Sequence, residues 1–194
     1  MSKTIILALD IATACGCADG AVGDVPRIWS WYLKDGGDSR PDRFLHLAKL
    51  LRSYFKTEPC SAVVYELPMP IGMIANKKDN RVMMSEANVA FARGAIGVVE
   101  MTCAEFGKPV EGVAVMDARQ SVLGWRTNRD KGIKTKDRVE RDVRALGIRA
   151  ESDNEADSYV IWQFCCNKLN PKLAVEQTPL FRTSAPIDEV EPDF

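Results

Sequence analysis

The stretch TIILALD at residues 4–10 and the stretch SAVVYE at residues 61–66 are both short apolar runs that end in an acidic residue. Runs of this length and composition are typical of buried β-strands. The segment between them is long enough for a crossover connection, so we expect the two strands to lie parallel. Parallel neighbours present their carboxyl ends at one edge of a sheet. The sequence therefore predicts that Asp10 and Glu66 lie at the same edge.

The segments around these two runs predict an α/β fold. Further strands are predicted at 12–22, 27–34 and 110–116, a loop at 67–80, and helices at 42–56, 82–106, 117–124, 135–147 and 153–168. This order predicts a mixed five-stranded sheet, in which an antiparallel meander of the first three strands is followed by parallel strands. The helices are expected to cover both faces of the sheet.

Local signals place several helix ends. Thr135 is expected to cap one helix, and Ser152 with Glu155 fits a capping box for the last helix. Gly124 and Gly147 are expected to end the helices that precede them.

The length and composition indicate a single folded domain. The chain has 194 residues, of which 46% are hydrophobic and 27% charged. We expect the domain to cover residues 1–169, followed by an acidic, proline-rich and flexible tail over 170–194. No apolar run reaches the roughly 18 residues that would suggest a transmembrane helix, and the N-terminus does not resemble a signal peptide. We therefore expect a cytoplasmic protein with no membrane partner.

Cysteine and histidine do not predict a catalytic centre. The six cysteines contain no C-x-x-C pair and His46 is the only histidine, which argues against structural zinc. His46 falls within a predicted amphipathic helix, so a Ser-His-Asp or Cys-His mechanism is not expected. Chemistry is expected to depend on carboxylates, lysines or a bound metal.

A third acidic group occurs in SDNEAD at residues 152–157. Asp157 can share one helix face with either Asp153 or Asn154. Oxygen ligands from separate segments suit Mg²⁺ or Mn²⁺, and two such ions about 4 Å apart are the arrangement used for phosphodiester hydrolysis. Asp10, Glu66 and Asp157 are therefore candidate metal ligands.

Basic residues gather in two segments. Residues 126–141 hold seven basic against three acidic side chains, whereas the formal net charge of the whole chain is −1. Lys77, Lys78 and Arg81 form a second cluster after the Glu66 strand. Such clusters are typical of a surface that contacts phosphates.

Together these segments resemble the RuvC-type Holliday junction resolvases of the RNase H-like superfamily. The resemblance covers roughly residues 4–168 and rests on ILALDIATACGCA, VVYELP, NVAFARGAIGVVE, DARQSVLG followed by TKDRV, and DNEADSYVIW. The tail and the cysteines look more like those of phage or prophage relatives, which would place the protein in a host cytoplasm. The resemblance implies an RNase H-like fold and Mg²⁺-dependent cleavage of four-way DNA junctions, with two ions (Mg²⁺ or Mn²⁺) per site.

The resemblance also implies roles for individual residues. Asp10, Glu66 and Asp157 match three members of the family's acidic quartet, and Asn154 stands at the fourth position. Asp153 could supply the missing charge, but we favour Asn154 because its spacing matches the family and Asp153 suits the first helical turn. Lys136 matches a lysine near the scissile phosphate, and the catalytic set is therefore Asp10, Glu66, Asn154, Asp157 and Lys136.

The expected DNA contacts come from bases and from one apolar wedge. Arg119 matches a second basic position of the family, and Met69 replaces an aromatic wedge at the junction centre. The full set of predicted DNA-binding residues is Met69, Lys77, Lys78, Arg81, Arg119, Arg126, Arg129, Lys131, Lys134 and Lys136. Symmetric cleavage implies a homodimer. The helix over 82–106, with Ala90, Gly94 and Gly97, is a candidate dimer face, and its packing against the sheet is an equal alternative.

Three other functions remain open on the sequence alone. Actin-like and sugar-kinase ATPases share the sheet topology, but they normally need two such domains, for which 194 residues leave no room. A second alternative is another RNase H-like nuclease that acts on branched or flap DNA. The third is a junction-binding protein whose catalysis is weakened at Asn154.

Overall fold

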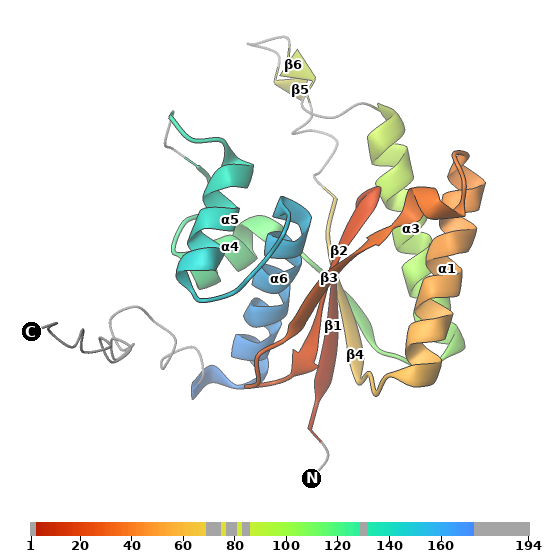
Figure 1. Ribbon diagram of the computed structural model, residues 1–194, viewed down its shortest axis with the longest axis horizontal. Helices are drawn as coiled ribbons and strands as arrows, with labels where there is room; N and C mark the ends of the chain where they lie inside the picture. The colour runs from red at the N-terminus through yellow and green to blue at the C-terminus, as the bar shows by residue number, and fades with distance from the viewer. Residues whose placement is uncertain (1–2, 69–74, 77–80, 83–85, 129–131, 173–194) are drawn as a thin grey trace, which may run out of the picture.

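Strand β1 lies at the centre of a five-stranded sheet with the order β3-β2-β1-β4-β7 (Figure 1). The computed structural model describes residues 3–68, 75–76, 81–82, 86–128 and 132–172. The strands of this sheet are β1 (Ile5–Asp10), β2 (Ala14–Ala21), β3 (Arg27–Tyr32), β4 (Ala62–Glu66) and β7 (Val110–Val113). The first three strands pair antiparallel, whereas β4 is parallel to both β1 and β7. The predicted mixed sheet, with its meander and its parallel strands, is confirmed.

Helices cover both faces of the sheet, as the sequence predicts (Figure 1). They are η1 (Leu33–Gly36), α1 (Arg40–Thr57), α3 (Glu86–Glu105), α4 (Val115–Leu123), α5 (Thr135–Ala145) and α6 (Asp153–Leu169). One face packs against α1 and α3, and the other packs against α6, which α4 and α5 cover in turn. Because α6 lies between the sheet and two helices, most of its residues are buried.

The alternation of β1 produces one core on each face. Leu7 and Leu9 belong to the core shared with α1 and α3, whereas Ile6 and Ala8 belong to the core shared with α4, α5 and α6. Successive strand residues point to opposite faces, so an uninterrupted apolar run is what a strand covered on both sides requires. The same rule accounts for β4, in which Val63 and Val64 contribute to different cores.

Several element boundaries differ from the sequence-based expectations. Leu33 and Lys34, predicted to end a strand, lie in the 3₁₀ helix η1. The predicted strand over 110–116 ends at Val113, and the helix predicted over 117–124 already begins at Val115. Apolar residues continue across this boundary, so hydrophobicity alone could not mark where the two-residue period of the strand gives way to the helical period. The predicted loop over 67–80 contains strand β5 (Ala75–Asn76), which pairs with β6 (Arg81–Val82). Residue 82, expected to begin a helix, lies in that second strand.

The helix caps were predicted in part. Gly124 and Gly147 have positive φ angles at helix ends, as expected. Lys134, not Thr135, is the N-cap of α5, because the residue before Thr135 is the one with extended backbone. Ser152 caps α6 through the Glu155 amide, but the Glu155 carboxylate accepts from the amide of Glu151 and not from that of Ser152. The capping box is therefore only half formed.

The two glycines of α3 have different surroundings. A side chain at Gly94 would meet the Phe44 ring of α1, with a closest approach of 2.4 Å, whereas one at Gly97 would meet nothing within 4 Å. Within this chain, α3 therefore approaches α1 closely at Gly94 but approaches nothing closely at Gly97. Across the described residues, no helix combines the length and the apolar composition needed to cross a membrane.

Candidate functional site

Asp10 and Glu66 end neighbouring parallel strands at one edge of the sheet. Leu9 of β1 is in register with Tyr65 of β4, so the acidic residue that follows each lies at the same edge. The interaction between the two carboxyl groups raises the pKa of Asp10 and opposes the rise in the pKa of Glu66, so the two groups lie close together. The convergence predicted for these two acids is therefore confirmed.

Gly16 lets the first turn of α6 approach this edge. It lies opposite Asp10 in the β1–β2 register. A Cβ atom at this position would stand 2.0 Å from the carbonyl oxygen of Asn154, which leaves no room for any side chain. The N-terminus of α6 therefore packs directly on the backbone of β2, and Asp157 on the second turn of the helix comes within electrostatic reach of Asp10 and Glu66.

The three carboxyl groups disfavour one another's charge. Burial and the charge of Glu66 raise the pKa of Asp10 well above its usual value, with a smaller contribution from Asp157. The pKa of Glu66 and that of Asp157 are also raised, in each case chiefly by burial. Buried acids that face one another in this way are an unstable arrangement unless a cation or protons balance the charge. The edge is thus suited to a positively charged group.

Arg119 of α4 supplies one positive charge at this edge. Its Nε donates to Oδ1 of Asp157 at 2.9 Å, and its Nη2 donates to Oδ2 at 2.5 Å. The side chains are only 15% and 9% exposed, respectively, so the pair is well shielded from water. This hydrogen bonding opposes the rise in the pKa of Asp157. Both oxygens of Asp157 are thereby engaged within the protein.

Trp125 holds a second arginine beside this pair. The guanidinium carbon of Arg119 lies 5.7 Å from the centre of the Trp125 ring, and that of Arg138 lies 4.4 Å from it. The indole nitrogen donates to Asp142 at 2.8 Å, which fixes the ring. These cation–π contacts fix the position of the guanidinium that faces the acids. Sequence reasoning did not select Trp125, although a tryptophan within a basic segment is a signal that could have found it.

The two candidates for the fourth metal ligand have different partners. Asp153 forms an ion pair with Lys136, whose pKa is raised mainly by that hydrogen bond. The side-chain amide nitrogen of Asn154 donates to the carbonyl oxygen of Ala14 at 2.6 Å, and no hydrogen bond to its amide oxygen is recorded among the described residues. The carboxylate of Asp153 is therefore occupied, whereas the oxygen of Asn154 is available.

The oxygen donors at this edge are compatible with a hard divalent cation once Asp157 is released from its ion pair with Arg119. Carboxylate and amide oxygens from β1, β4 and α6 are the ligand types that Mg²⁺ and Mn²⁺ prefer. Within the part of the chain that is described, however, no three acidic, histidine or cysteine side chains are already arranged to hold a metal. The ion pair between Arg119 and Asp157 provides a physical reason, since it turns both Asp157 oxygens toward the guanidinium.

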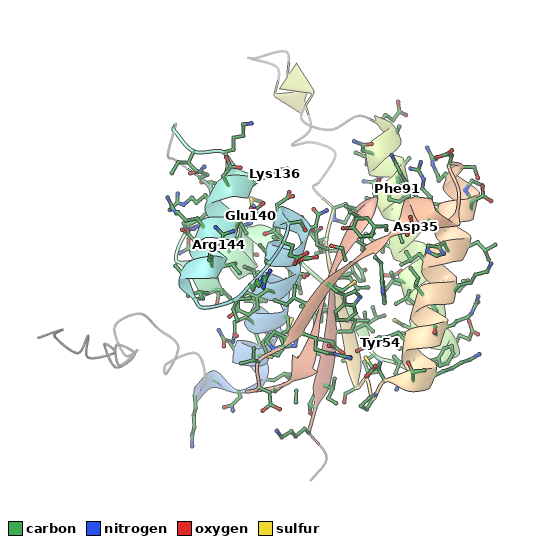
Figure 2. The ribbon with its side chains drawn as sticks, viewed as in Figure 1. Asp35, Tyr54, Phe91, Lys136, Glu140 and Arg144 are labelled. Carbon is green, nitrogen blue, oxygen red and sulfur yellow. The ribbon has the colours of Figure 1, made fainter. Side chains whose placement is uncertain are left out.

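The predicted DNA-binding residues fall into three groups. Arg119 pairs with Asp157 at the acidic edge, and Lys136 on α5 (Figure 2) lies within electrostatic reach of Asp10 and Asp157. Arg126 pairs with Asp117 at 2.9 Å, and Lys134 is exposed before α5. The remaining predictions fall on residues whose side chains lie outside the described part of the structure: Met69, Lys77, Lys78, Arg81, Arg129 and Lys131.

This arrangement defines a class of fold, a mixed sheet with acids at the ends of its first and fourth strands and on its last helix. No family model matches the sequence, and a search of curated proteins finds no significant match. Comparison with solved structures finds the same fold in proteins of under 20% identity.

Among the similar structures are RuvC of Thermus thermophilus and a yeast mitochondrial Holliday junction resolvase, Ydc2. RuvC alone has 18% identity and a TM-score of 0.56, covering 86% of this chain and 96% of its own. RuvC in complex with a Holliday junction substrate has 15% identity and a TM-score of 0.58, with the same coverage. Ydc2 has 11% identity and a TM-score of 0.56, covering 91% of this chain and 85% of its own. These structures confirm the RNase H-like fold expected from the resemblance to RuvC.

Proposed function

We propose that the protein is a structure-selective endodeoxyribonuclease that resolves four-way DNA junctions with divalent metal ions. The observation that carries this proposal is the meeting of Asp10, Glu66 and Asp157 at one sheet edge, with Arg119 and Lys136 beside them. The fold adds support, because RuvC has been solved with a Holliday junction and has the same architecture.

In this proposal, Asp10, Glu66, Asp157 and the amide oxygen of Asn154 would hold Mg²⁺ or Mn²⁺. Bound ions would lower the pKa of the attacking water and stabilise the leaving 3′ oxygen. The chain's own contribution is to bring four oxygen ligands from three separate elements to one edge, where Asp10 and Asp157 are buried and Glu66 and Asn154 are half-buried. Burial strengthens the electrostatic attraction between these groups and a cation, because little water is present to screen it.

The basic side chains would act on the DNA itself. Lys136 carries its positive charge beside the acids, where it is 69% exposed and able to leave Asp153 for a phosphate group. Arg119 would serve the same purpose once released from Asp157. Because such contacts are made to phosphates, we expect the affinity for DNA to fall steeply as the salt concentration rises.

A homodimer would provide two equivalent sites for the two strands that must be cut. The outer side of α3 is available for this contact in a single chain, because Ala90 and Gly97 are exposed while Ala95 and Val99 face the core. We therefore retain α3 as the proposed dimer face, and residues 1–169 as the nuclease domain.

The proposal is tested by offering purified protein a labelled four-way junction, a linear duplex and a flap, with Mg²⁺ or with EDTA. Cleavage of the junction in Mg²⁺ and none in EDTA is the expected result. Equal or faster cleavage of the flap would favour a broader branched-DNA nuclease. Binding without cleavage of any substrate would favour a junction-binding protein. Full activity in EDTA would contradict the metal-dependent mechanism.

A further inference from the structure

A hollow of about 400 Å³ opens beside the candidate site, on the side of the sheet that α1 and α3 cover. Its wall begins at Ile11–Thr13, the residues that directly follow Asp10. The hollow therefore lies next to the acidic edge of the sheet. Phe91, which lines it, and Lys136 lie at the same end of the molecule on opposite sides of the sheet (Figure 2).

Two arginines from the first turn of α1 line this hollow. Arg40 is exposed and has no ion pair or hydrogen bond recorded among the described residues. Arg43 is partly buried, and its Nε donates to the carbonyl oxygen of Gly37 at 3.4 Å, a long hydrogen bond that restrains the guanidinium. Asp38 is the one acidic side chain among the described residues that line the hollow, so these lining residues have a positive balance.

The beginnings of two long helices face the same hollow. Arg40 begins α1, an 18-residue helix, and Ala87 and Asn88 lie in the first turn of α3, a 20-residue helix. Both helices begin at the end of the sheet that carries Asp10 (Figure 1). Each N-terminus contributes a partial positive charge, which is offset in part by the acidic side chain in the same first turn, Asp42 in α1 and Glu86 in α3. The shape of the hollow and the two arginines that line it are therefore the features that favour an anion here.

We propose that this hollow binds backbone phosphates of the DNA arm that leaves the site on the α1–α3 side. The inference rests on the proposed junction-cleaving function and extends it to a surface that sequence reasoning did not select. Lys136 and Arg119 belong to elements on the opposite side of the sheet, so phosphates on the α1–α3 side would need other basic groups. A four-way junction has arms on both sides of the cleavage point, whereas a linear duplex held by α4 and α5 need not reach the hollow.

The test is the affinity of Arg40→Gln, Arg43→Gln and Ala87→Glu for a labelled junction and for a linear duplex. Binding is measured by fluorescence anisotropy over a range of salt concentrations, with Ca²⁺ in place of Mg²⁺ to prevent cleavage. Ala87→Glu places a negative charge in the hollow without removing either arginine. The matched control is Lys49→Gln, which removes an exposed positive charge of α1 outside the lining. Thermal unfolding verifies that each variant is folded.

Arg40→Gln and Arg43→Gln are each expected to weaken junction binding roughly fivefold to tenfold and to reduce the salt slope by about one. Ala87→Glu should weaken it at least as much. Lys49→Gln should bind like the unaltered protein, and duplex binding should change less than twofold in all four. Variants that all match Lys49→Gln, or that lose junction and duplex binding equally, would overturn the inference. Failure of the unaltered protein to bind a junction would instead contradict the proposed function.

Discussion

Arg119 donates two hydrogen bonds to Asp157, one to each carboxylate oxygen, at 2.9 and 2.5 Å. The arginine comes from α4 and the aspartate from α6, so the pair joins two helices at the edge that carries Asp10 and Glu66. In the metal-free protein, the guanidinium balances part of the charge of three buried carboxyl groups. Under the proposed function, it would also compete with a metal ion for the same two oxygens.

Arg119→Gln should therefore raise the affinity of the free protein for Mn²⁺ by about tenfold, or about 1.4 kcal/mol. The same change should lower the free energy of unfolding without metal by about 3 kcal/mol, because it leaves a buried charge unpaired. Mn²⁺ titration and thermal unfolding check the two effects. Arg52→Gln, which breaks the Arg52–Glu105 ion pair between α1 and α3, is the control. Weaker Mn²⁺ binding by Arg119→Gln would contradict the competition.

The stability of the metal-free protein should fall as the pH rises. The pKa values of Asp10, Glu66 and Asp157 are raised by burial and mutual repulsion, so the folded chain holds protons that the unfolded chain releases near pH 4. Stability is then lost from about pH 4 upward, through the raised pKa values.

Asp10→Asn removes the most strongly perturbed of these carboxyl groups. In EDTA its melting temperature should exceed that of the unaltered protein by a few degrees at pH 8, and the difference should vanish near pH 4. Asp24→Asn, which removes the exposed partner of Lys3, should show no such trend. If the difference in melting temperature between Asp10→Asn and the unaltered protein stayed constant over this pH range, burial of the Asp10 charge would not be what destabilises the protein at high pH.

Gly16→Ala should destabilise the protein by about 1–3 kcal/mol, because the new methyl group would meet the backbone of Asn154 and push α6 away from β2. Gly97→Ala is the matched control. Its site on α3 is open, so replacing a helical glycine should stabilise the protein by up to about 1 kcal/mol. Urea unfolding measures both changes. An unaffected Gly16→Ala would mean that the start of α6 can move without cost.

The fourth ligand is tested by Asn154→Ala and Asp153→Asn over a Mg²⁺ titration of junction cleavage. Asp153 is paired with Lys136, whereas the amide oxygen of Asn154 is available, so Asn154→Ala should raise the Mg²⁺ requirement and Asp153→Asn should not. We expect the required Mg²⁺ concentration to rise about tenfold, which is the lower end of the loss in metal affinity when a group that supports a metal ligand is removed. The reverse pattern would assign the position to Asp153.

Much of the fold could be predicted because its rules are local. The apolar runs that end at Asp10 and Glu66 mark two buried strands, and the connection between them determines that they are parallel. The same rule brought both acids to one edge. The predicted boundaries were wrong where a strand is followed by a helix with no polar residue between them, as between Val113 of β7 and Val115 of α4.

The partners within the site could not be predicted, because they depend on how helices rotate against one another. The sequence placed Arg119 near a phosphate and Asp157 near a metal, but not the two side chains against each other. The hollow beside Asp10 also escaped prediction, because its walls come from three segments that are distant in sequence. Arg40 and Arg43 lie outside the two basic clusters from which the DNA-binding residues were predicted.

The proposed nuclease activity is tested by mapping the products that the protein and its Asp10→Asn variant make from a four-way junction. We predict paired nicks in two opposing strands in Mg²⁺, with 3′-hydroxyl ends that a ligase can seal. Asp10→Asn should still bind the junction but cleave it at least about a thousandfold more slowly. Unchanged cleavage by Asp10→Asn, or products with no symmetric relationship, would contradict the proposed function.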